Sequence, residues 1–259
     1  MAYETLLVDR SSSGVVTVTM NRPEKKNAAN DVMWDELLSV FTSVALNDDD
    51  RVLVLTGAGG AFCSGQDLTS VGSITRNGLS RMRWIGSVAL ALHRLPKPTI
   101  ACVGGVAAGA GCNMAFGCDL VVASDEARFS EIFSRRGLSL DFGGSWLLPR
   151  LIGLHRAKEL AFFADVLSAK EAEAFGLVNR VVGAGELSAF VADWAARLAA
   201  GPPLALSLTK TMLNNSLSVS FDQALEDEAR SQNVNFASAD FSEALTAFVE
   251  KRDPKFEGR

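Results

Sequence analysis

Two glycine-bearing stretches of this 259-residue chain have the residue types that stabilise a developing negative charge. They are residues 61–68 (AFCSGQDL) and residues 104–113 (GGVAAGAGCN). Small side chains let the backbone approach a ligand closely, and the unpaired N–H groups at a helix start favour an anion. A developing oxyanion needs two such donors that converge on it. One stretch after each of two adjacent strands would supply them, whereas the competing interpretation is a pair of tight, closely packed turns.

Other chemistries lack the residues that they need. Segment 109–114 misses the third glycine of a dinucleotide-binding turn, and neither a Walker A nor a GxSxG pattern occurs. The two histidines, His93 and His155, are expected to be solvated or capping residues at helix ends. The four cysteines form no CxxC pair and lie in apolar or glycine-rich runs, so we expect buried free thiols. The sequence therefore predicts neither a metal site nor Ser-His catalysis.

The elements that must position the two stretches alternate along the first half of the chain. Apolar, β-branched runs predict strands at residues 14–20, 51–57, 99–103 and 119–123. Apolar residues at helical spacing predict helices at residues 30–46, 79–95, 143–152, 154–164, 169–176, 186–200, 203–215, 219–235 and 239–251. Residues 178–182 are the one late strand-like segment. This order predicts an α/β fold with mostly parallel strands, followed by a helical C-terminal part.

The composition argues against two classes of binding partner, nucleic acids and membranes. Hydrophobic residues make up 48% of the chain and charged residues 21%, which is typical of a globular protein. The net charge of −5 and the lack of a basic stripe argue against a nucleic-acid partner. No apolar run reaches the roughly 20 residues that span a bilayer, and residues 1–4 do not begin a secretory signal. We therefore expect a cytoplasmic protein with no membrane partner.

The two stretches closely resemble the oxyanion-hole segments of the crotonase superfamily, the enoyl-CoA hydratases and isomerases. Residues 21–28 (NRPEKKNA), 167–172 (LSAKEA) and 176–178 (GLV) resemble further family segments in the same order, and the resemblance extends from about residue 5 to residue 257. It implies a crotonase-like core of repeated β-β-α units over residues 1–195 and a helical trimerisation region over 196–259. It also implies an acyl-CoA substrate and a homo-trimer or hexamer. No cofactor is implied, because coenzyme A enters as part of the thioester.

The resemblance assigns roles to individual residues. The oxyanion donors are the backbone N–H groups of Gln66 and Ala110, which directly follow Gly65 and Gly109. Many members carry glycine where this chain has Ala110, but a backbone donor tolerates the exchange. The implied neighbours of the coenzyme A moiety and of the acyl group are Lys25, Lys26, Ala28, Ser64, Gly65, Asp67, Leu68, Gly109 and Phe133. The alternative for the lysines is a solvated charged turn.

Simple hydration is disfavoured by two substitutions. Hydratases of the family place two glutamates around the attacking water, and the matching positions here are Asn113 and Phe133. Neither side chain can act as an acid or a base. Glu131 lies two residues before Phe133, but this offset gives no assurance that its side chain points to the place of the hydratase glutamate.

Asp141 is the remaining candidate base. It precedes a predicted helix, so its residue type and position alone favour an N-cap. The resemblance implies a different role, because isomerases of the family use an aspartate at this position. Together with GVAAGAG and GQDL, the run from Asp141 to Trp146 is most similar to the ring-epoxide isomerase branch. We therefore expect Asp141 to carry a proton between two carbons of an enolate held by Gln66 and Ala110.

Several alternatives stay open. An acyl pocket could be lined by Phe133, Phe142, Trp84 and Trp146, although aromatic residues at such spacing are more often plain core. Within the family, the alternatives are a hydratase and a thioester hydrolase, since the same oxyanion hole serves acyl transfer. Outside its acyl-CoA enzymes, related folds host serine peptidases and RNA-binding proteins. The missing Ser-His pair and the acidic balance oppose these two.

Overall fold

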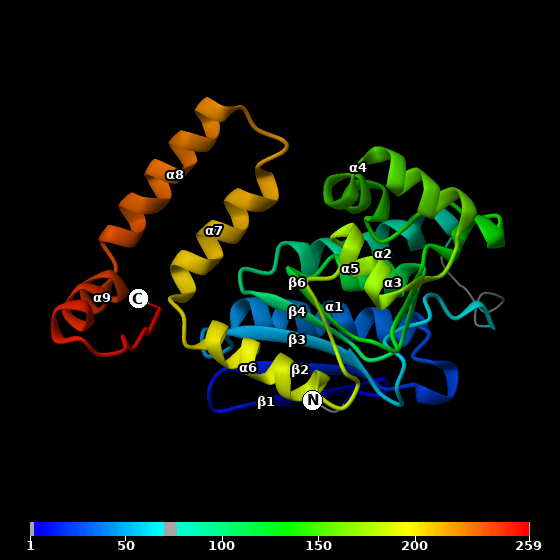
Figure 1. Cartoon of the computed structure of the whole chain (residues 1–259), viewed down its shortest axis with the longest axis horizontal. Coiled ribbons are helices and arrows are strands. Elements are labelled where there is room, and N and C mark those ends of the chain that lie inside the picture. Colours follow the sequence, from blue (N-terminus) through cyan, green and yellow to red (C-terminus); the bar gives the residue numbers. More distant parts are fainter. Residues whose placement is uncertain (1–2, 70–76, 259) are drawn as a thin grey trace.

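A computed structural model describes residues 3–69 and 77–258 of the chain. Its main sheet has six strands in the order β1-β2-β3-β4-β6-β9, in which β1 and β2 are antiparallel and every other pair is parallel (Figure 1). The strands are β1 (Leu6–Arg10), β2 (Val15–Met20), β3 (Val52–Gly57), β4 (Thr99–Val103), β6 (Leu120–Ser124) and β9 (Arg180–Val182). The predicted α/β class with mostly parallel strands is confirmed.

Helices cover both faces of this sheet, which explains its apolar strands. Every residue of β4 is buried, and so are the first four residues of β3. On one face, Val54 and Ile100 pack with Val191 of α6 (Leu187–Ala199). On the other face lie α1 (Asp31–Leu46) and α2 (Gly78–His93), whose apolar residues join the main core (Figure 1).

A second sheet of three short strands holds the segments nearest to the site. It pairs β5 (Val106–Ala108) with β7 (Arg128–Ser130) in parallel and β7 with β8 (Leu167–Ser168) in antiparallel. The sequence pattern predicts none of these three strands, because two or three residues are too short to show an alternating pattern. The pattern does not predict β1 either. Helix α3 (Ala110–Phe116) follows directly after β5, so its first residues lie at the end of a strand.

The remaining elements form the helical part of the chain. They are the 3₁₀ helices η1 (Pro23–Lys25) and η3 (Ile132–Arg136) and the helices α4 (Gly144–Phe163), α5 (Ala169–Phe175), α7 (Pro203–Asn215), α8 (Phe221–Phe236) and α9 (Ala239–Glu250). The element α4 consists of two helices that meet at a kink at Gly153, where the backbone is non-helical, which agrees with the two helices predicted at residues 143–152 and 154–164. Helices α7, α8 and α9 extend away from the α/β core (Figure 1). Residue 195, the expected boundary, lies inside α6. Within the described ranges, no helix is long and apolar enough to cross a membrane.

Candidate active site

The two glycine-bearing stretches lie side by side. Cys63 forms an isolated bridge with Ala107, and its carbonyl oxygen accepts a hydrogen bond of 2.9 Å from the Ala108 amide. Gly65 has a φ of +94°, and a Cβ atom there would lie 2.8 Å from the Ala108 oxygen and 3.7 Å from the Ala110 nitrogen. Only glycine lets the backbone at residue 65 come this close to Ala108 and Ala110. The residue that follows, Gln66, is thereby placed next to the start of α3.

Two amides at this junction have no acceptor. Gly109 is the N-cap of α3 (φ 54°, ψ −127°), and Ala110, the first residue of the helix, has no intrahelical acceptor for its N–H group. Ala29 forms an isolated bridge with Gln66: the Ala29 amide donates to the Gly65 oxygen, and the Asp67 amide donates to the Ala29 oxygen. This bridge does not use the amide of Gln66. Among the residues that the structure describes, neither Gln66 nor Ala110 donates its amide hydrogen to a protein atom. Their positions fit the two-donor site expected from the sequence.

Aromatic residues bring the Asp141 segment to the same place. The indole Nε1 of Trp34 donates to the Gln66 side-chain Oε1 at 2.9 Å, and the Trp34 ring stacks on Phe142 with centroids 5.4 Å apart. From the opposite side, the Asn113 side-chain Nδ2 of α3 donates to the Asp141 carbonyl oxygen at 3.0 Å. Asp141 is thus held between the α3 segment and the segment that contains Gln66.

Asp141 does not cap the helix that follows it. The N-cap of α4 is Gly143, which has no side-chain cap, so the capping interpretation of Asp141 is wrong. Its carboxylate is partly buried, and its Oδ1 atom is buried without a hydrogen-bond partner. Burial raises the pKa of Asp141 to about 6, although the nearby Arg81 guanidinium opposes the rise. A carboxyl group with this pKa exchanges protons near neutral pH.

Glu131 is a buried acid that sequence analysis left undecided. Its side chain is only 2% exposed, and its Oε2 accepts a hydrogen bond of 3.2 Å from Asn113 Nδ2. Burial raises the pKa of Glu131 to about 8, and the Asp141 charge adds to the rise. Glu131 is therefore a buried side chain bonded to Asn113 and is not exposed to solvent. The only feature of the sequence that could have indicated this burial is its position next to an apolar strand.

The expected coenzyme A neighbours also come together. The turn at η1 lies against the 61–68 stretch, because the Ser64 amide donates to the Lys26 oxygen at 3.0 Å and the Ser64 hydroxyl donates to the Lys25 oxygen at 3.2 Å. Lys25 and Lys26 are exposed, Leu68 is 51% exposed, and Ala28 is buried. The Asp67 carboxylate accepts from Arg22 at 2.9 Å, which ties it into the protein.

Comparison with known proteins shows the family to which the chain belongs. Residues 10–259 match the family described as enoyl-CoA hydratase/isomerase. The chain is 39% identical to the 1,2-epoxyphenylacetyl-CoA isomerase of Escherichia coli, over 98% of each chain, and 39% identical to a probable enoyl-CoA hydratase of Rhodobacter capsulatus, over 100% of each. A crystal structure of enoyl-CoA hydratase from Bacillus anthracis superposes with a TM-score of 0.95 at 31% identity, covering 99% of this chain and 100% of that one.

The chain belongs to the enoyl-CoA hydratase/isomerase family. It is therefore an enzyme of acyl-CoA thioesters, and its fold is the crotonase fold of that family. The two positions that the sequence matched to the hydratase glutamates have other tasks here. Asn113 is fully buried and links Glu131 to Asp141, while Phe133 is buried, with its ring next to Gly109.

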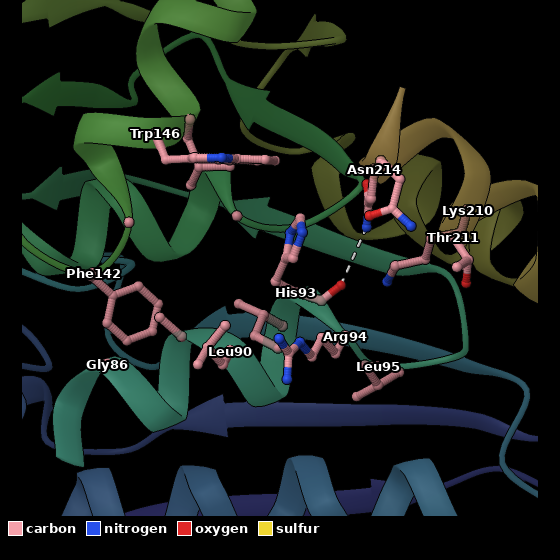
Figure 2. A pocket seen from close by; sticks show the side chains of 16 residues that line it. Gly86, Leu90, His93, Arg94, Leu95, Phe142, Trp146, Lys210, Thr211 and Asn214 are labelled. Carbon is pink, nitrogen blue, oxygen red and sulfur yellow. Dashed lines mark hydrogen bonds between the residues drawn. The ribbon is translucent and has the colours of Figure 1, made fainter. Parts of the chain in front are cut away.

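A cavity of about 780 Å³ opens beside Phe142 in this family member. Figure 2 shows Phe142 and Trp146 on one side, the end of α2 with Leu90 and His93 on another, and Lys210 of α7 on a third. Trp146 packs edge-on against His93, with ring centroids 5.2 Å apart. Of the four aromatic residues expected to line an acyl pocket, Phe142 and Trp146 line this cavity, whereas Trp84 and Phe133 do not.

The remaining expectations about chemistry concern cysteine and metal. All four cysteines are buried free thiols, as predicted, and burial raises the pKa of Cys63 to about 11. His93 is the last residue of α2, and His155 is exposed within α4. Among the described residues, no group of three or more His, Cys, Asp or Glu side chains is arranged to hold a metal ion.

Proposed function

We propose that this enzyme is an enoyl-CoA isomerase, which moves a double bond of an unsaturated acyl-CoA through an enolate. The observation that carries the proposal is Asp141, a partly buried carboxyl group with a pKa raised by burial to about 6. Its segment is bound to Asn113 of α3 and, through Phe142 and Trp34, to the side chain of Gln66. The substitution of both hydratase glutamates, by Asn113 and Phe133, supports a one-base reaction. The 39% identity to a protein named 1,2-epoxyphenylacetyl-CoA isomerase supports the same branch.

The proposed reaction needs one base and two hydrogen-bond donors. Asp141 removes a proton from the carbon next to the thioester carbonyl, and the electron pair of the C–H bond moves onto the carbonyl oxygen. The N–H groups of Gln66 and Ala110 stabilise this oxyanion. Asp141 then returns the proton two carbons further along, where the electron pair of the original double bond forms the new C–H bond. The C=C pair of the enolate becomes the conjugated double bond, and an electron pair of the oxyanion re-forms the carbonyl. No atom is gained or lost, so the product is a conjugated isomer of the substrate.

The rest of the substrate binds away from the chemistry. We place the coenzyme A moiety on the turn of Lys25, Lys26 and Ala28, next to Ser64 and Leu68, where the exposed ammonium groups suit phosphate oxygens. Asp67 supports this surface through Arg22 rather than contacting phosphate. The acyl group extends toward the cavity beside Phe142 and Trp146. Binding energy from the remote coenzyme A lowers the barrier at the reacting carbons.

We also propose that the enzyme is a homo-trimer or a dimer of trimers. Large apolar side chains project from the C-terminal helices with little cover, including Phe221 at 77%, Phe236 at 60% and Phe248 at 83% exposure. A monomer seldom leaves so many large apolar groups together on its surface. Contacts between copies through α8 and α9 would cover them.

Absorbance of the conjugated thioester tests the reaction. A 3-enoyl-CoA and a 2-enoyl-CoA are offered separately to the enzyme. Rising absorbance with the first and no change with the second is the expected result. Falling absorbance with the second would mean that water is added across the double bond, which would replace the isomerase proposal by a hydratase and make Glu131 the acid to examine.

A further inference from the structure

One side-chain amide joins the carboxyl group of Glu131 to the main chain of Asp141. Asn113 Nδ2 donates both of its hydrogens, one to Glu131 Oε2 at 3.2 Å and one to the Asp141 carbonyl oxygen at 3.0 Å. Asn113 is fully buried and Glu131 is 2% exposed. The main chain of Asp141 is therefore bonded to a buried acid through a single amide.

Three buried oxygens of this cluster have no hydrogen-bond partner. They are Asn113 Oδ1, Glu131 Oε1 and Asp141 Oδ1, and no other such buried side-chain atom occurs in the part of the chain described. All three are acceptors while both carboxyl groups are ionised. Buried acceptors without donors are costly, so a group of three in one place calls for an explanation.

A proton on Glu131 supplies the missing donor. Asn113 Oδ1 and Glu131 Oε1 belong to the two side chains that the Nδ2–Oε2 bond already joins. A carboxylic acid and a primary amide pair reciprocally: the amide N–H donates to one carboxyl oxygen, and the acid O–H donates to the amide oxygen. One proton on Oε1 therefore gives a partner to both unpaired atoms. Burial independently favours the neutral form, since it raises the pKa of Glu131 to about 8.

We propose that Glu131 is a positioning residue, which as a neutral acid pairs reciprocally with the Asn113 amide and thereby fixes the main chain of Asp141. The catalytic part of this inference rests on the proposed function, because it takes Asp141 as the base. The acid–amide pair does not depend on the reaction.

The segment after Asp141 shows why it needs such a support. Phe142 has a φ of +47° and Gly143 a φ of +84°, so two consecutive residues adopt the left-handed region. For phenylalanine this backbone is strained and must be held by its surroundings. A Cβ atom on Gly144 would lie 2.4 Å from Asn113 Nδ2, so this segment is fitted closely around the Asn113 amide.

Burial and a neighbouring charge together favour a neutral Glu131. Desolvation raises its pKa and the Asp141 carboxylate adds to the rise by repulsion, whereas the hydrogen bonds from Cys112 and Asn113 lower the pKa by less. Arg81 of α2 acts on Asp141, and its Nη2 lies 2.6 Å from Asp31. Glu131 does not raise the pKa of Asp141 in turn, because it is still neutral when Asp141 ionises. An ionised Glu131 would both break the pair and add a negative charge beside the base.

Two substitutions of similar size separate pairing from packing. Glutamine at this position, Glu131→Gln, keeps one donor and one acceptor at every pH, whereas methionine, Glu131→Met, fills a similar space and cannot pair. We expect Glu131→Met to lower kcat by about tenfold to a hundredfold with little change in KM, because the base is misplaced. Glu131→Gln is expected to recover at least about tenfold of that loss. Folding of both variants is checked by circular dichroism.

The pH profile adds a result that packing cannot produce. The wild-type kcat/KM is expected to fall above a pH of about 8, where Glu131 ionises, and Glu131→Gln is expected to lack this alkaline limb. A folded Glu131→Gln protein with the same alkaline limb as the wild type would overturn the inference. Equal impairment of the glutamine and methionine variants would do so as well.

Infrared spectroscopy tests the pair without any substrate. The difference spectrum between the wild type and Glu131→Gln at neutral pH is expected to contain the C=O band of a protonated carboxylic acid, which disappears as the pH rises past about 8. Absence of this band would mean that Glu131 is ionised, and the inference would fail. Because the band is independent of turnover, failure of the pair and failure of the isomerase reaction are separate results.

Discussion

Every residue of α3 from Ala110 to Phe116 is buried, whereas no residue of α7 is, and α8 buries only Ser231. The two regions also differ in the kind of group that lacks a partner. Around α3 these are polar atoms: the amides of Gln66 and Ala110 and the buried oxygens of the Asn113 cluster. On the C-terminal helices they are apolar side chains such as Phe248, at 83% exposure.

The difference indicates what each region is built to receive. Unpaired donors in a closed, small-residue environment are preorganised for a charge that develops during a reaction. Exposed large apolar side chains on helices are suited to permanent cover by another protein surface. In the proposals above the α3 region serves chemistry and the C-terminal helices serve assembly, and each of the following predictions tests one side of this comparison.

Removal of the base should have the largest effect. Asp141→Asn keeps the shape of the side chain but cannot accept a proton, so we expect kcat to fall by about a thousandfold or more. The measurement is the appearance of the conjugated thioester from a 3-enoyl-CoA. Asp165→Asn is a suitable control, because Asp165 is an exposed aspartate paired with Arg135 at 3.0 Å. Full activity of Asp141→Asn would rule out the proposed mechanism.

Disturbance of one oxyanion donor should have the next largest effect. In Gly65→Ala the new Cβ atom meets the Ala108 oxygen at 2.8 Å, at a φ that alanine rarely adopts, so the adjacent Gln66 amide must shift. We expect kcat to fall by about a hundredfold with a smaller change in KM. Gly185→Ala is the matched control, since a Cβ there meets no atom within 4 Å. Equal activity of the two variants would contradict the role of this turn.

A charge on the C-terminal helices should weaken assembly. The wild type is expected to have three or six times the chain mass of 27.6 kDa in light scattering. Phe248→Glu places a carboxylate where an apolar contact is expected, and the dissociation constant should rise by about thirtyfold or more. Lys251→Glu changes the charge of a neighbouring exposed residue as a control. A wild type of 27.6 kDa in solution would refute the proposed trimer.

The decrease of kcat/KM at acid pH should reflect protonation of Asp141. Because burial raises its pKa to about 6, kcat/KM is expected to fall about tenfold per pH unit below that value as the base becomes protonated. The profile is measured with the 3-enoyl-CoA in buffers of constant ionic strength. An activity that stays level down to a pH of about 4.5 would show that the essential base has an ordinary carboxyl pKa.

The last prediction concerns stability rather than activity. The folded-state pKa of Glu131, about 8, lies above its usual 4.5, so folding holds a proton that the unfolded chain releases between these values. This stabilisation is present below pH 4.5 and is lost as the pH rises through about 8. Relative to Glu131→Gln, the wild-type free energy of unfolding should fall by up to about 1.4 kcal/mol per pH unit in this window. Urea denaturation at pH values of about 5 and about 8 would measure it, and a constant difference between the two proteins would contradict the buried neutral acid.

Local patterns were enough to predict most long elements and the oxyanion segments. Helix α1 shows helical spacing of apolar residues, and β4 is a run of four apolar residues after Thr99 that ends before a glycine pair. Both were predicted within one or two residues. The glycines at 65 and 109 indicated close backbone approach, which the positive φ values at both residues now explain. These features depend on neighbours in the chain, so the sequence by itself determines them.

The tertiary structure decided the rest. Residue type and position favoured Asp141 as an N-cap, but the turn through Phe142 and Gly143 moves the cap to Gly143 and leaves the carboxyl group near Arg81. The task of Asn113 depends on Glu131, 18 residues later, and on Asp141, 28 residues later. Burial of Glu131 arises only when the segment that follows β7 meets Asn113 of α3, and a pKa depends on that burial rather than on neighbours in sequence. Hydrogen bonds and desolvation across the fold are set by distance in space, which residue spacing alone does not specify.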